Sequence, residues 1–190
     1  MDELVERIIS IINQREHNTL FLSCRTPSQI NQGIKGFLYN KQIHLSEVDV
    51  LFLERFIKKD SDDPLVRWLY QSYNYDCHLT FELAFSNTDL IPNELFNECS
   101  VTLLNNQGKQ YFQFPKKVIT YQQVAMLTQE DILLLASNQL ITDLARERLQ
   151  EKKVIVVERS SPYADGKSSW KCSFCLLYTS DAADDTPCVD

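Results

Sequence analysis

Short segments with the apolar spacing of a helix alternate along this chain with short apolar segments typical of strands, and this alternation restricts the fold more than any other feature. Helices are expected at 2–14, 26–33, 48–58 and 64–73, and strands at 20–24, 42–45 and 77–85. In the last strand the apolar residues occupy every second position, which predicts one buried and one polar face. We therefore predict an α/β fold: a small mixed sheet with flanking helices and an N-terminal amphipathic helix.

The second half of the chain continues the alternation in a more compact form. Segments 101–104 and 110–114 flank an Asn- and Gly-containing stretch and predict a β-hairpin. A βαβαβ-like module is expected over 118–157, and Thr142 is expected to cap the N-terminus of its helix at 143–152. The predicted organisation is a helix and connector at 1–18, an α/β domain at 19–157 and a polar tail at 158–174.

The last segment, residues 175–190, resembles a translated sequencing adapter. Codons of a common library adapter can encode Cys175 to Asp184, and fixed adapter sequence can resume at Val189 after a variable index. We therefore exclude this segment from the fold and treat the natural C-terminus as unknown. We expect its removal to change the free energy of unfolding by less than about 0.5 kcal/mol.

This exclusion also removes the one spacing that resembles a metal site, Cys172-Ser-Phe-Cys175. A structural zinc ion needs four ligands, and the sequence offers no second pair at such a spacing. The remaining cysteines, Cys24, Cys77, Cys99 and Cys172, are scattered and favour buried thiols in a reducing cytoplasm. No metal ligand is predicted.

Charge and hydropathy restrict the class of partner. The chain carries 19 basic and 26 acidic residues, and without the four aspartates of segment 175–190 the net charge becomes −3. This balance gives no basic surface for nucleic acid. The apolar runs are too short to span a membrane and the N-terminus lacks the basic region of a signal peptide, so we expect a soluble, cytoplasmic protein.

The residues that usually carry catalysis are not arranged for it. Four glycines, Gly33, Gly36, Gly108 and Gly166, cannot form a glycine-rich phosphate loop, and the three histidines lie far apart. Cys77 and His78 are neighbours on a strand and point to opposite faces, so they cannot act as a nucleophile and its base. We expect Cys77 in the core and predict no catalytic or cofactor-binding residue.

Four segments resemble the PduM family of propanediol-utilisation bacterial microcompartment proteins. They are 117–128, Ile132-Leu-Leu-Leu135, Leu140-Ile-Thr-Asp-Leu-Ala-Arg-Glu-Arg-Leu149 and Val154-Ile-Val-Val157. Weaker similarity extends upstream to residue 3. The resemblance implies a noncatalytic protein of the microcompartment, in the cytoplasm, that contributes to assembly or organisation with shell proteins or encapsulated enzymes as partners. The alternative is an accessory enzyme or ligand-binding protein in cobalamin or nucleotide handling.

One short motif within this resemblance recurs in other microcompartment proteins, those of ethanolamine metabolism. Its members here are Ile141, Thr142, Ala145 and Arg146. Two interpretations of Arg146 remain open: its planar guanidinium binds a carboxylate or phosphate, or it forms an ordinary surface ion pair with Asp143.

The N-terminal helix is the remaining candidate for a binding element. Its apolar stripe consists of Leu4, Val5, Ile8, Ile9, Ile11 and Ile12. Short terminal helices of this design are similar to encapsulation peptides, which dock proteins onto microcompartment shells. The stripe is equally compatible with packing into the protein's own core, so both interpretations stay open at this stage.

Overall fold

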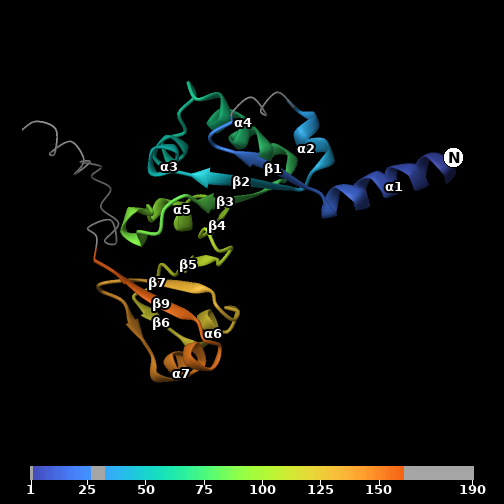
Figure 1. The fold of residues 1–190 in the computed structure, drawn as a ribbon. Helices are drawn as coiled ribbons and strands as arrows, with labels where there is room; N and C mark the ends of the chain where they lie inside the picture. The colour runs from blue at the N-terminus through green and yellow to red at the C-terminus, as the bar shows by residue number, and fades with distance from the viewer. Residues whose placement is uncertain (1, 27–32, 161–190) are drawn as a thin grey trace, which may run out of the picture.

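The computed structural model describes residues 2–26 and 33–160 (Figure 1). Most of the helix expected at 26–33, most of the tail 158–174 and the whole of 175–190 lie outside the described residues. The elements are α1 Asp2–His17, β1 Thr19–Ser23, α2 Lys35–Tyr39, β2 Gln42–Val48, α3 Val50–Ile57, α4 Pro64–Ser72, β3 His78–Leu83, α5 Glu94–Asn97, β4 Val101–Leu104, β5 Tyr111–Gln113, β6 Val118–Ile119, α6 Tyr121–Val124, β7 Ile132–Ala136, β8 Leu140–Ile141, α7 Asp143–Glu151 and β9 Ile155–Arg159.

The first sheet has four parallel strands in the order β1-β2-β3-β4. Its buried side chains follow the predicted alternation, with Leu79, Phe81 and Leu83 of β3 almost fully buried. Helices α3 and α4 contribute apolar residues to the same core, where the ring of Phe56 meets Phe81 edge-on at 4.9 Å between centroids. The alternating pattern therefore identified the buried face correctly.

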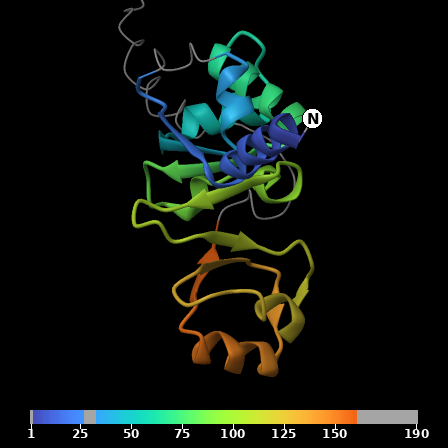
Figure 2. The same ribbon diagram turned by 90° about the vertical axis from the view of Figure 1, so that its right-hand side faces the viewer.

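The second half forms a three-stranded parallel sheet, β5-β7-β9, and a two-stranded parallel pair, β6-β8. All five residues of β7 are buried. Leu133 packs with α6 and α7 in a second core, whereas Leu134 packs in the first core. Both faces of β7 are covered, which explains its continuous apolar sequence. Helix α7 lies at the end of the molecule opposite α3 and α4 (Figures 1 and 2).

The α/β class and the N-terminal helix are confirmed, but the strands form three sheets.

The prediction of a β-hairpin at 101–114 is wrong. Its turn forms as the sequence indicates, with Gly108 at a φ of +77° and the side chain of Asn105 accepting hydrogen bonds from two backbone amides. Only one antiparallel bridge follows, between Leu104 and Gln110, because β4 pairs with β3 and β5 pairs with β7. Local turn chemistry fixed the reversal, and tertiary partners decided the pairing.

A second difference concerns Arg159, which the sequence placed in a polar tail. It is the last residue of β9 and is 1% exposed. Its guanidinium donates to the side-chain oxygens of Asn93 at 2.8 Å and Gln113 at 3.0 Å, and to the backbone oxygen of Ile91. Burial lowers the pKa of this guanidinium. The predicted end of the α/β domain at residue 157 is therefore too early, because β9 continues to a buried cation. Two of the three acceptors of this cation lie 66 or more residues away in sequence.

Among residues 2–26 and 33–160, none of the helices has the length and apolar character that a membrane crossing requires.

Candidate functional site

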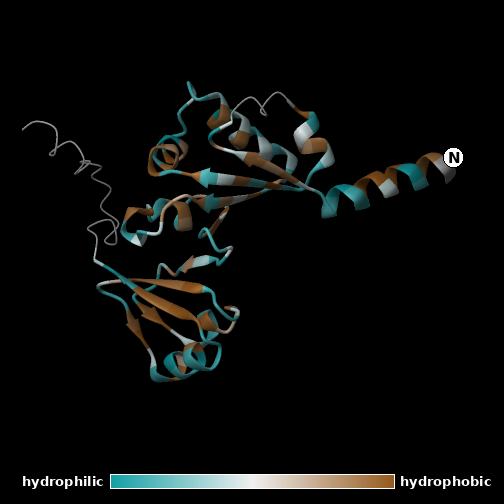
Figure 3. Cartoon of the chain, viewed as in Figure 1, coloured by the Kyte–Doolittle hydropathy of each residue, from teal (hydrophilic) through white to brown (hydrophobic). Residues whose placement is uncertain are grey.

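Helix α1 extends away from the body of the molecule, and apolar residues recur along it (Figures 1 and 3). Their side chains are exposed. The members of this α1 face are Leu4, Val5, Ile8, Ile9, Ile11 and Ile12, and each is between 46% and 65% exposed. At 100° per residue they cover roughly 160° of the helix circumference. The described part of the chain therefore leaves a broad apolar surface open to solvent, and it does not use this stripe as its own core.

The base of α1 is fixed by Arg15. Its Nε donates to the backbone oxygen of Phe37 at 3.0 Å, and its Nη2 donates to the backbone oxygen of Tyr75. Arg15 continues the i, i+4, i+7 spacing of Leu4, Ile8 and Ile11, so it points to the same side of the helix. This anchor was not predicted, although the spacing of Arg15 was an available signal. Helix α1 is therefore held at its C-terminal end, and its apolar stripe lies on the same side of the helix as the anchoring Arg15.

An exposed helix of this kind gains stability when a partner covers it. A single helix of about 16 residues is marginal in water, and β-branched residues weaken it further. Fully burying one Leu, Ile or Val side chain contributes about 1.5–3 kcal/mol. Covering several of the six side chains of the α1 face would therefore both order the helix and drive association.

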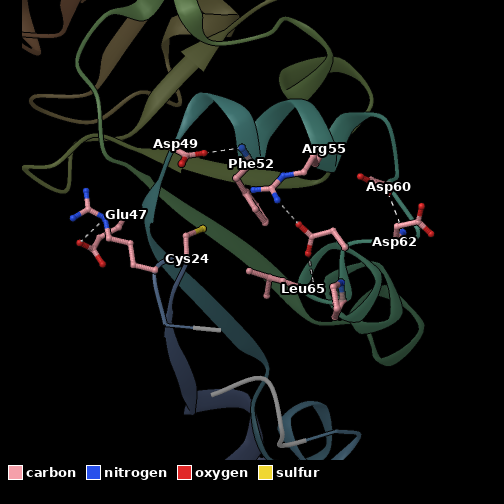
Figure 4. A pocket seen from close by; sticks show the side chains of 11 residues that line it. Cys24, Glu47, Asp49, Phe52, Arg55, Asp60, Asp62 and Leu65 are labelled. Atoms are coloured by element: carbon pink, nitrogen blue, oxygen red, sulfur yellow. Dashed lines mark hydrogen bonds and ion pairs between the residues drawn. The ribbon is translucent and has the colours of Figure 1, made fainter. Parts of the chain in front are cut away.

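A second candidate is a cavity of about 570 Å³ beside the carboxyl ends of β1 and β2 (Figure 4). The N-termini of α3 and α4 also meet this cavity, and open parallel sheets commonly bind ligands in such a position. It is lined by Cys24 and by seven charged residues: Arg25, Glu47, Asp49, Arg55, Asp60, Asp62 and Asp63. By its location alone, the cavity is a candidate cofactor site.

Several charged residues of this cavity cap helices or form ion pairs within the chain. Asp49 accepts from the amide of Phe52 at 2.7 Å and so caps α3. Asp63 accepts from two amides at the start of α4 and pairs with Arg55 at 3.0 Å. Both helix N-termini that would attract a phosphate therefore hold a carboxylate of the same chain. With five acidic and two basic residues, the cavity disfavours an anionic cofactor.

The thiols near these sites are poor nucleophiles. Burial and the nearby Asp49 carboxylate raise the pKa of Cys24 to about 12. Cys77 is 4% exposed, its Sγ lies 3.4 Å from the backbone oxygen of Asn40, and burial raises its pKa as well. Both thiols are protonated at neutral pH, which is the unreactive form. The expected core position of Cys77 is confirmed, and within the described ranges no group of three metal-ligating side chains forms.

Three residues of the motif Ile141, Thr142, Ala145 and Arg146 have structural roles, and the fourth, Arg146, is exposed. Thr142 caps α7 by accepting from the amide of Ala145 at 3.4 Å, and Ala145 is fully buried in the second core. Ile141 belongs to β8 and packs against that core. Arg146 is exposed, and the ion pair with Asp143 that was one of its two open interpretations does not form, whereas the nearby Arg148 binds Glu151 at 2.8 Å. Arg146 therefore faces solvent with its guanidinium unpaired among the described residues.

Comparison with known proteins identifies a family. No curated protein and no solved structure matches the chain significantly. A family model with the description "Putative propanediol utilisation" matches residues 3–155. The match runs from the first turn of α1 to the first residue of β9, so it includes eight of the nine described strands, the fully buried residues of both cores and the α1 face. The chain therefore belongs to this propanediol-utilisation family.

Proposed function

We propose that this protein is a noncatalytic component of a bacterial microcompartment for propanediol utilisation, of the PduM type, and that it links shell and interior through α1. The observation that carries this proposal is the α1 face, whose six apolar side chains are each 46–65% exposed on a helix that the described part of the chain anchors at its base. Family membership supports the pathway. The partners proposed are microcompartment shell proteins or encapsulated enzymes.

The width of the α1 face indicates the kind of surface that receives it. A two-stranded coiled coil uses a narrow seam of two positions in seven, whereas an apolar arc of roughly 160° is typical of a helix covered from several sides. A groove on a folded partner provides such cover, and laying an amphipathic helix into a groove is a common mode of recognition. We therefore expect α1 to dock into a preformed apolar groove.

Two observations support a role without catalysis. In the cavity at the carboxyl ends of β1 and β2, Asp49 caps a helix and Asp63 pairs with Arg55. The thiol of Cys24 in this cavity and that of Cys77, beside the base of α1, are both protonated at neutral pH. The alternative is an accessory enzyme or ligand-binding protein, for which the cavity of about 570 Å³ would be the site. Assays with ATP, cobalamin and pathway aldehydes distinguish them: we expect no turnover, and saturable turnover lost in Arg55→Ala would favour the alternative.

The docking role is tested with a double charge substitution on the α1 face, Ile8→Glu with Ile12→Glu. Because these side chains are exposed, the variant should remain folded and its free energy of unfolding should change by less than about 0.5 kcal/mol. It should no longer co-purify with microcompartments, because two charges would be buried in an apolar groove.

The matched control is Ser10→Glu with Asn13→Glu, which adds the same charge to the polar face of the same helix. This control should co-purify like the unmodified protein. If the first variant still enters microcompartments normally, or if the control is lost equally, α1 is not the docking element.

A further inference from the structure

A cleft of about 390 Å³ lies between α7 and β9. Both elements belong to the half of the molecule away from α1 (Figure 1). Its walls are apolar, with Leu135 from β7, Leu149 from α7 and Val156 from β9. Its charged residues are Arg146, Lys153 and Glu158. The cleft therefore combines an apolar floor with an excess of positive charge.

The cleft is bordered by a strand with a free edge. Strand β9 is the last in the order β5-β7-β9, so its outer edge pairs with no other strand of the described chain. Ile155 and Val156 on this strand are 41% and 40% exposed. An open strand edge presents backbone donors and acceptors to which an extended peptide can add.

The cations of the cleft are available for a ligand. Neither Arg146 nor Lys153 forms an ion pair with any described residue. The neighbouring basic residues are already engaged: Arg148 pairs with Glu151, and Lys152 donates to the backbone oxygens of Ala125 and Leu127. Among the described residues, the two cations that line the cleft, Arg146 on α7 and Lys153 just after it, are thus free of ion pairs. A planar guanidinium binds a carboxylate through two parallel hydrogen bonds.

From these features we propose that the cleft binds an extended segment of a partner protein that carries an acidic side chain. The segment adds to the outer edge of β9 as a further strand. Its carboxylate lies between Arg146 and Lys153, and its neighbouring apolar side chains cover Val156. Charge complementarity selects this occupant, and the strand edge distinguishes a peptide from a small carboxylate. This site does not depend on α1, so it gives the protein a second, separate contact.

The probe is a fluorescein-labelled peptide with the sequence Thr-Val-Glu-Val-Thr, measured by fluorescence anisotropy. Two matched peptides separate the contributions: one with Gln in place of Glu, and one with its alternate backbone amides N-methylated. The protein variant is Arg146→Gln and its control is Arg148→Gln, on the same helix. Thermal melts of both variants show that they are folded.

We expect Arg146→Gln and the Gln peptide each to weaken binding at least about tenfold, as loss of a charge-assisted pair implies, with Arg148→Gln unchanged. N-methylation should abolish binding, because it removes the backbone donors needed for strand addition. The proposal is overturned by absent binding at millimolar peptide or by equal binding of the Gln peptide. It is also overturned if the N-methylated peptide binds as well as the unmodified one, since the cleft would then be a site for small carboxylates.

Discussion

At the scale of single residues, two arginines determine how this chain is held together. Arg15 anchors α1 through backbone oxygens of Phe37 and Tyr75, and Arg159 joins β9 to β5 and to the segment before α5. The spacing of Arg15 was a signal of its role that was missed, whereas nothing in the sequence indicated the burial of Arg159, because most arginines are exposed and Arg159 lies at the start of a polar stretch. A buried guanidinium becomes recognisable only when the backbone oxygens that surround it are known.

We expect Arg159→Met to lower the free energy of unfolding by about 2–4 kcal/mol, because the oxygens of Ile91 and Gln113 lose their buried donor. Urea unfolding followed by circular dichroism measures the change. The control Arg146→Met removes an exposed arginine and should stay within about 0.5 kcal/mol of the unmodified protein. Equal stability of the two variants would show that the buried network contributes nothing.

The thiol of Cys24 gives a prediction of pH dependence. Its pKa in the folded protein is raised from 9.0 to about 12, so the alkylation rate with iodoacetamide should rise about tenfold per pH unit from about pH 8 to 11 without levelling. In urea the rate should level above about pH 9. A raised pKa favours folding below pH 9, and this contribution is lost as the pH rises towards 12. Mass spectrometry of the Cys24 peptide follows the rate, and a plateau near pH 9 in the folded protein would contradict the prediction.

At the scale of elements, sequence pattern predicted the strongly periodic segments and failed where partners decide. Strand β3 and the Thr142 cap of α7 were predicted correctly, because alternation and capping are local signals. The pairing of β4 with β3 and of β5 with β7 was not predicted, because parallel partners are not neighbours in sequence. For α1, the helix and its apolar stripe were predictable. Its exposure was not, because core helices and docking helices share the same periodicity.

The exposure of α1 predicts fast hydrogen exchange. Residues 4–14 are all exposed, so their helical hydrogen bonds open without the loss of any core contact. Their amides should exchange orders of magnitude faster than those of β2 and β3, and should become protected in co-purified microcompartments. Hydrogen–deuterium exchange with mass spectrometry measures both states. Protection of α1 equal to that of β3 in the isolated protein would mean that something already covers the helix.

At the scale of the whole molecule, the two cores lie on opposite faces of strand β7. The alternate residues of β7 face opposite sides, with Ile132 and Leu134 in the first core and Leu133 and Leu135 in the second. The buried Arg159 adds a polar connection between the same two halves. A family match that spans residues 3–155 is consistent with both halves forming one folded unit. The connection predicts that neither half melts alone.

This coupling is tested with Leu133→Ala, a substitution in the second core that is read out in the first. Leu133 is fully buried, so its truncation should lower the free energy of unfolding by about 2–5 kcal/mol. Trp68 lies in the first core, and with Trp170→Phe as background it is the only tryptophan. Its fluorescence should report the same lowered midpoint as circular dichroism, because one cooperative transition includes both cores. If circular dichroism shows an early partial transition while Trp68 unfolds at its original midpoint, the halves are independent and β7 does not couple them.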